Sequence, residues 1–284
     1  MTGRPFCGLT DAHVIHWGTA QIRAQAALDY GLMAGAAFTV ITGEAGSGKT
    51  SLLLNMVENA AESVKVAFVQ GLRRGGASVM PWILQSLGHE VTGDEAETVL
   101  YTRVQDLLIE EYAAGRRVAL IFDEAQNLST AALDELRVLT NINTARDQLV
   151  QIVLCGQPTL LAHLQSPDLG GLSQRVASWG HLNPLSRTDL DGYIGTRLAS
   201  AGGPEDLFTA EALDMIQEAT GGLPRPINQL CELALVYAMT GGGAEIDAPV
   251  VRQVLEDGLF MPPAIPAPPE PVKPRDGRLR LAVG

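Results

Sequence analysis

Residues 43–50 read GEAGSGKT and match the phosphate-binding pattern GxxxxGK[ST] at every fixed position. Glycines in such a loop let the backbone curl until its N–H groups point inward at phosphate oxygens. We expect Lys49 to reach the β- and γ-phosphates and the hydroxyl of Thr50 to ligate Mg²⁺. The alternative, a glycine-rich turn that binds nothing, is disfavoured because a strand-like run precedes the loop and a helix-like run follows it. The predicted nucleotide-binding residues are Gly43, Glu44, Ala45, Gly46, Ser47, Gly48, Lys49, Thr50 and Ser51.

Two carboxylates follow the apolar run 118–122, at the end of a predicted buried strand. The carboxyl ends of parallel strands are where open α/β sheets bind their ligands. We expect Asp123 to hold Mg²⁺ through water and Glu124 to polarise an attacking water as general base. The alternative is that both residues merely begin a loop or cap a helix. Downstream of a complete phosphate-binding loop, a carboxylate that orients water favours hydrolysis of ATP over transfer to a substrate hydroxyl.

A parallel sheet would position these motifs, and the apolar runs along the sequence predict such a sheet. Strands are predicted at 37–42, 64–69, 118–122, 150–154 and near 179–182, with helices between them. From 186 to 258 only helices are predicted, at 188–200, 209–220, 224–239 and 248–256. The fold class is therefore α/β, a P-loop domain with a parallel sheet, followed by a small all-helical domain. The predicted units are an N-terminal segment and helix (1–36), the P-loop domain (37–185), the helical domain (186–258) and a disordered Pro-rich tail (259–284).

Composition narrows the class of protein. The net charge of −12 disfavours a generic nucleic-acid or membrane-surface binder. The three cysteines show no metal-knuckle or CxxC spacing, which fits small buried thiols in a reducing compartment. Residues 1–10 lack the basic start and apolar run of a signal peptide, and no apolar run approaches the roughly 20 residues that cross a bilayer. We expect a cytoplasmic protein without membrane insertion.

Further motifs occur in a fixed order: LIFDEAQNLS, ELRVLTNIN, QLVQIVLCGQPTL, LSQRV and GGLPRPINQLC. Together with GEAGSGKT they resemble the ExeA/GspA family of AAA+ ATPases, which is related to the TniB/TnsC/MuB transposition ATPases. The resemblance covers roughly residues 5–258. It implies an AAA+ fold in which the helical domain acts as a lid.

The resemblance also implies roles for three residues. Gln157 stands where the family has its sensor-1 residue, which positions the lytic water; the alternative is a turn residue. Arg175 stands where the family has its arginine finger, which reaches the ATP of a neighbouring subunit; the alternative is a surface arginine. Arg225 resembles the sensor-2 arginine that contacts the γ-phosphate from the lid; the alternative is a solvated residue at a helix start. A finger acting between subunits implies a homo-oligomer, either a ring or a filament.

Two functional classes follow from the resemblance. The transposition relatives are soluble and assemble on duplex DNA, and residues 72–76 (LRRGG) could contact its phosphates; the alternative is a flexible surface loop. The secretion relatives carry a membrane anchor after the ATPase core, where this chain has its Pro-rich tail. We therefore expect an ATP-dependent DNA-binding regulator that works with a transposase-like partner. The alternative is an ExeA/GspA-type assembly or remodelling ATPase with a secretion partner, and a third is a nucleotide-dependent scaffold with little turnover.

Overall fold

The centre of the chain is a parallel sheet of five strands in the order β2-β3-β4-β1-β5. We describe it from a computed structural model that covers residues 3–7, 15–71, 78–144, 146–169, 171–241 and 245–263. The middle strands β3, β4 and β1 are almost wholly buried, as expected for apolar runs covered on both faces. The strands are β1 (Phe38–Gly43), β2 (Val64–Val69), β3 (Arg117–Phe122), β4 (Val150–Gly156) and β5 (Val176–Leu182).

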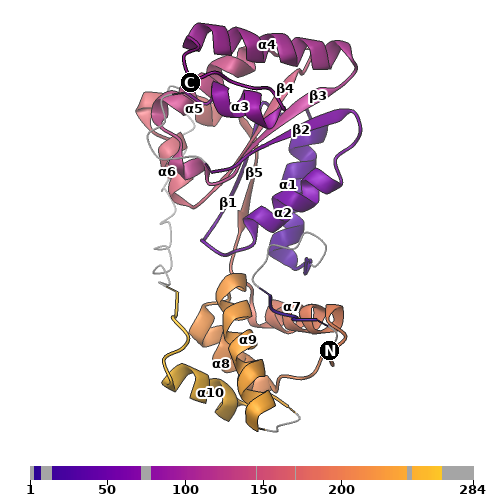
Figure 1. Cartoon of the computed structure of the whole chain (residues 1–284), viewed down its shortest axis with the longest axis vertical. Coiled ribbons are helices and arrows are strands. Elements are labelled where there is room, and N and C mark those ends of the chain that lie inside the picture. The colour runs from indigo at the N-terminus through magenta and orange to yellow at the C-terminus, as the bar shows by residue number, and fades with distance from the viewer. Residues whose placement is uncertain are drawn as a thin grey trace, which may run out of the picture.

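Helices cover both faces of the sheet (Figure 1). Successive strand residues point to opposite faces, so Val40 packs into one apolar cluster and Ile41 into the other. The first two helices, α1 (Thr19–Met33) and α2 (Lys49–Glu58), pack on the Ile41 face. The opposite face is covered by α3 (Met80–Ser86), α4 (Glu97–Ala113), α5 (Thr130–Leu139) and α6 (Thr159–Leu164). Short 3-10 helices follow strands and helices at η1 (Ala125–Asn127), η2 (Thr140–Ile142), η3 (Pro167–Leu169) and η4 (Leu172–Arg175).

After β5 the described chain is helical, apart from an isolated bridge between Phe208 and Ile246. The helices are α7 (Arg187–Ser200), α8 (Ala210–Thr220), α9 (Pro224–Gly241) and α10 (Ala248–Glu256). Three of them begin at a side-chain cap, because Ser186, Thr209 and Asp247 each accept an N–H from the first turn. Figure 1 shows these helices grouped beyond one end of the sheet. They share an apolar cluster with Phe6 of the N-terminal segment.

The N-terminal segment joins this helical part although it precedes the sheet in sequence. Phe6 is 2% exposed and packs edge-on against Phe208, with ring centroids 6.0 Å apart. Arg4 forms an ion pair of 2.7 Å with Glu232 of α9. Helix α1 packs instead on β5 of the sheet. The domain limits at residues 36, 185 and 258 stay predictions.

None of the helices in the described ranges combines the length and the apolar character that a membrane crossing requires. The predicted DNA-contacting loop at 72–76 and the tail from residue 264 onward lie outside the described residues.

Candidate functional site

The phosphate-binding loop connects β1 to α2, as its sequence predicts. Gly46 and Gly48 have φ values of +83° and +96°, a region that favours glycine. Lys49 is only 5% exposed. Its Nζ donates to the carbonyl oxygens of Gly43 and Glu44, each at 2.9 Å. The loop thus wraps around a buried ammonium group at the start of α2.

Two features of this loop favour an anion. The hydroxyl of Ser47 is buried and has no hydrogen-bond partner in the described part of the chain. The first turn of α2 contains no acidic residue that would compete for its free N–H groups. A helix N-terminus with a lysine beside it attracts negative charge. The arrangement therefore suits a phosphate group.

The acidic pair lies at the end of β3, separated from β1 by β4. Asp123 is 6% exposed, and its Oδ2 accepts a hydrogen bond of 2.7 Å from the hydroxyl of Thr50. Its other carboxylate oxygen accepts the backbone N–H of Glu124 at 2.9 Å. The structure thus brings together Thr50 and Asp123, which stand 73 residues apart in sequence. Glu124 is exposed and lines the same cavity as the loop.

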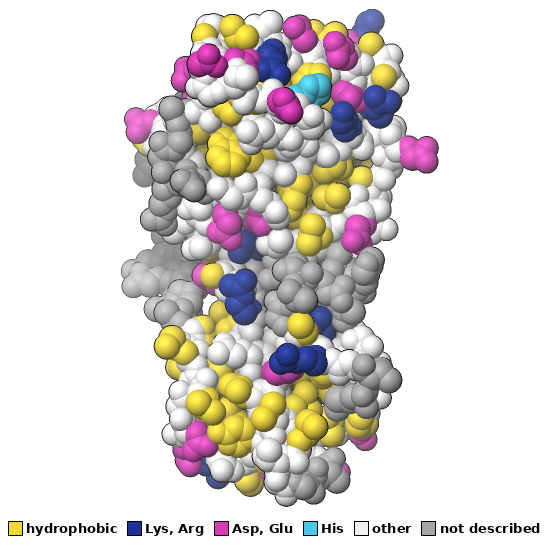
Figure 2. Space-filling view, viewed as in Figure 1, with side chains coloured by type: hydrophobic (Ala, Val, Ile, Leu, Met, Phe, Trp, Pro, Cys, Tyr) yellow, Lys and Arg dark blue, Asp and Glu magenta, His cyan; other side chains and the backbone are white. Residues whose placement is uncertain are grey.

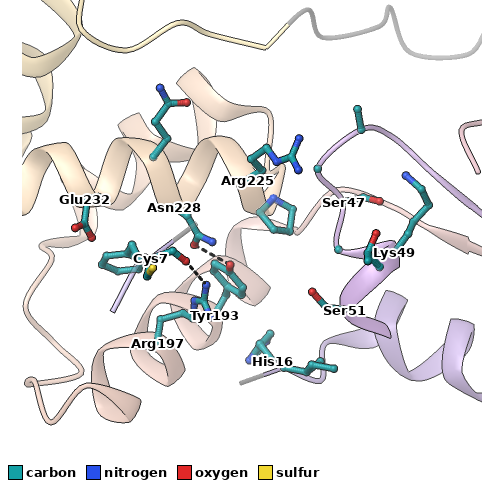
Figure 3. Close-up of a pocket in the computed structure, with 18 of the residues that line it drawn as sticks. Cys7, His16, Ser47, Lys49, Ser51, Tyr193, Arg197, Arg225, Asn228 and Glu232 are labelled. Atoms are coloured by element: carbon teal, nitrogen blue, oxygen red, sulfur yellow. Dashed lines mark hydrogen bonds between the residues drawn. The ribbon is translucent and has the colours of Figure 1, made fainter. Parts of the chain in front are cut away.

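A cavity of about 650 Å³ is lined by this loop and by the helical part. Figure 3 shows Arg225, at the start of α9, facing the loop beside Ser47. The backbone N–H of Arg225 donates to the carbonyl of Gly46 at 3.1 Å, so the helical part touches the loop directly. On the face shown in Figure 2, several Lys and Arg side chains lie at the level where the two parts meet.

The far wall of the cavity comes from α7, α9 and the N-terminal segment. Tyr193 donates its hydroxyl to Asn228 at 2.8 Å, and Arg197 lies over the Tyr193 ring at 5.8 Å (Figure 3). Arg197 is 8% exposed and donates from Nη2 to the carbonyl of Cys7 at 3.5 Å. Its Nε is buried without a partner among the described residues. Sequence reasoning missed this wall, because its members come from three distant segments.

Two histidines near the loop are shifted towards the neutral form. Burial lowers the pKa of His16, which lines the cavity, although Asp189 acts in the opposite direction. Burial also lowers the pKa of His181, which Glu44 opposes. The hydroxyl of Thr42 lies 2.8 Å from Nδ1 of His181. Both rings therefore add little positive charge to the site at neutral pH.

Gln157 lies at the end of β4 and is not among the described residues that line the cavity. Its backbone N–H donates to Oε1 of Gln126 at 3.0 Å. The side chain of Gln126 thus connects the main chain of Gln157 to Glu124, because it also donates to the Glu124 carboxylate.

Arg175 lies at the amino ends of the strands, whereas the phosphate-binding loop lies at their carboxyl ends. It directly precedes β5, whose start is paired with Phe38 at the start of β1. Its Nη1 donates to the carbonyl of Arg137 at 3.1 Å and to side-chain oxygens of Thr140 and Asn141 at 2.9 Å. A guanidinium at the carboxyl end of α5 is favoured by the helix dipole. Arg175 is therefore held away from this chain's own cavity.

Comparisons with known proteins identify the family of the chain. Residues 33–164 match the family model described as an AAA domain. General secretion pathway protein A from Aeromonas hydrophila is 35% identical over 223 residues, which make up 78% of this chain and 41% of that protein. The chain is thus an ExeA/GspA-like AAA+ protein. It spans less than half the length of that relative.

Solved structures confirm the fold class of this ExeA/GspA-like chain. The Aeropyrum pernix ORC2 protein in its ADPNP-ADP complexes aligns with a TM-score of 0.62 and 19% identity, covering 86% of this chain and 67% of that one. Cdc6p from Pyrobaculum aerophilum aligns with a TM-score of 0.65 and 17% identity, covering 86% and 68%. At such identities the likeness shows a shared fold alone.

Proposed function

We propose that this ExeA/GspA-like chain binds ATP with Mg²⁺ and hydrolyses it. The observation that carries the proposal is that one cavity is lined by the phosphate-binding loop, with Thr50 bonded to Asp123, and by Glu124. Lys49 is buried, and its two carbonyl partners carry no formal charge. A phosphate would supply the counter-charge that a buried ammonium requires.

The residues at the loop also fit Mg²⁺. Thr50 and Asp123 place a hydroxyl and a carboxylate in hydrogen-bond contact, and oxygen donors are the ligands that this ion prefers. Thr50 would hold the ion directly and Asp123 through water. When bound, Mg²⁺ neutralises charge on the phosphates.

The chain's own groups would do the rest of the chemistry. Glu124 faces the cavity and would take a proton from the attacking water. Arg225 would contact the γ-phosphate from α9, so that the angle of the helical lid depends on the nucleotide state. The role of Gln157 as sensor-1 residue rests on the family resemblance alone.

Hydrolysis is proposed to require an oligomer. Arg175 cannot serve this chain's own cavity, because it lies at the amino ends of the strands and the cavity lies at their carboxyl ends. Its three hydrogen bonds hold the guanidinium at the carboxyl end of α5. We infer that it stabilises the phosphate charge in a neighbouring subunit of a ring or filament.

For the biological role we favour assembly or remodelling linked to secretion, which was the alternative from sequence. Its support is the name of the 35% identical relative, a general secretion pathway protein. The preferred expectation from sequence, a DNA-binding regulator with a transposase-like partner, has no such support. Its candidate loop at 72–76 also lies outside the described residues.

The test is release of phosphate from ATP by the purified chain, with and without duplex DNA, at two salt concentrations. We expect Mg²⁺-dependent release that DNA leaves unchanged. Absence of release across a range of protein concentrations would contradict the proposed hydrolysis. Stimulation by DNA that weakens with salt would instead restore the DNA-binding interpretation.

A further inference from the structure

Gln126 connects the ends of two neighbouring strands. It lies in η1, directly after β3, and its Oε1 accepts the backbone N–H of Gln157 at the end of β4 at 3.0 Å. Its Nε2 donates to the Oε2 of Glu124. Because the carbonyl end accepts an N–H, the amide end must point at the carboxylate, and a flip would break both bonds. The backbone N–H of Gln157, directly after β4, therefore fixes the side-chain NH₂ of Gln126 as the hydrogen-bond donor to Glu124.

Glu124 occupies an unusual turn. Its φ of 54° makes it the one residue other than glycine with a left-handed backbone in the ranges that the structure describes. That conformation turns the chain from β3 into η1 and leaves the side chain exposed at the cavity. An exposed glutamate has several rotamers, so some contact must select the one that faces the cavity. A hydrogen bond from an amide to a carboxylate is charge-assisted and strong enough to do so.

Gly156 provides the space for this contact. A Cβ at this position would lie 2.6 Å from Oε1 of Gln126 and 3.1 Å from Cδ2 of Leu160. Any larger residue would push the amide away from the N–H of Gln157. The close approach of the Gln126 side chain thus favours glycine at 156.

We propose that Gln126 is a positioning residue that orients Glu124 towards the cavity, anchored on the main chain of Gln157. This inference rests on the proposed hydrolysis of ATP, with Glu124 as base. Gln126 itself is not among the described residues lining the cavity, so its loss leaves ATP affinity unchanged. Residues that orient a metal ligand from the outer shell are worth about 10–100-fold in activity, and we expect a similar loss of turnover here.

The first test is steady-state hydrolysis by Gln126→Met, which keeps the side-chain length but has no donor and only a weak acceptor. We expect kcat to fall about 10–100-fold with the KM for ATP unchanged. Gly156→Ala, whose new methyl group at the end of β4 displaces the Gln126 amide, should likewise lower kcat and leave the KM for ATP unchanged. Gln165→Met, at an exposed glutamine at the end of α6, is the matched control and should keep wild-type kcat.

A second test separates orientation of the base from a structural role. In single-turnover reactions, adding Gln126→Met to Glu124→Gln should cause no further loss, because the oriented carboxylate is already absent. Equal losses in the wild-type and Glu124→Gln backgrounds would overturn the proposal. A turnover rate of Gln126→Met within twofold of wild type would overturn the role of Gln126 but leave the proposed hydrolysis standing. A wild-type chain without ATP hydrolysis would overturn the proposed function as well.

Discussion

The contact between the phosphate-binding loop and the helical lid depends on Gly46. Its carbonyl accepts the N–H of Arg225 at 3.1 Å, and its φ is +83°. A Cβ at Gly46 would lie 2.8 Å from the Cβ of Arg225, at the start of the lid helix α9. Gly46→Ala should therefore strain the loop and push the lid away. Gly48→Ala is the matched control, because Gly48 has a φ of +96° but an added Cβ meets no described heavy atom within 4 Å.

The two substitutions separate two contributions to stability. A side chain in the left-handed region costs about 1–2 kcal/mol, and this applies to both variants. Overlap with a packed neighbour adds about 1–3 kcal/mol, and this applies to Gly46→Ala alone. We expect Gly46→Ala to lower the free energy of unfolding by about 1–3 kcal/mol more than Gly48→Ala does.

The assay is equilibrium unfolding in urea without nucleotide, followed by circular dichroism. Equal losses in the two alanine variants would refute the close contact between loop and lid. As a second check, Arg225→Gly removes the Cβ with which the new side chain overlaps. The loss caused by Gly46→Ala should therefore be smaller in the Arg225→Gly background than in the wild type, and an equal loss in both would also contradict the reasoning.

Three other predictions test the site. Thr50→Ala should reduce the gain in ATP affinity that Mg²⁺ gives over EDTA, measured by calorimetry, because one oxygen ligand is removed; an unchanged gain contradicts that role. Mixed Arg175→Ala and Glu124→Gln subunits should release more phosphate than either alone, because one shared interface keeps both groups; a simple average excludes action between subunits. ATP should slow alkylation of Cys7, which lines the cavity, while burial raises the pKa of the Cys155 thiol and keeps it unreactive. Peptide mass spectrometry measures both, and ATP-independent labelling of Cys7 would place ATP elsewhere.

Local patterns allowed most strands and helices to be predicted. The predicted bounds of β2, residues 64–69, coincide with the structure. The exposed face of α1 was less predictable: Ile22 and Tyr30, whose spacing indicates the helix, are 55% and 60% exposed. On its buried face, Gln21 and Leu28 are joined by two small residues, Ala24 and Gly31, the latter close against Thr39. Close approach of α1 to the sheet selects these small residues, and that approach is a tertiary property.

The candidate site was likewise predictable only in part from the sequence. The phosphate-binding loop and Asp123 follow from motifs whose geometry is local, and the strand order then brings Thr50 to Asp123. The far wall needs the N-terminal segment, α7 and α9 in one place, which only the folded chain reveals. Gln126 had a weak signal, since it stands two residues after Glu124. Its second partner, the main chain of Gln157, is identified only by the pairing of β3 with β4.

The central claim is that this cavity binds ATP and that Glu124 drives its hydrolysis. The most direct measurement compares ATP affinity and phosphate release for the wild type and Glu124→Gln under one set of conditions. We expect Glu124→Gln to bind ATP with wild-type affinity in Mg²⁺ and to release phosphate about 10²–10⁴-fold more slowly, because a general base contributes that much. Wild-type phosphate release by Glu124→Gln would contradict the account.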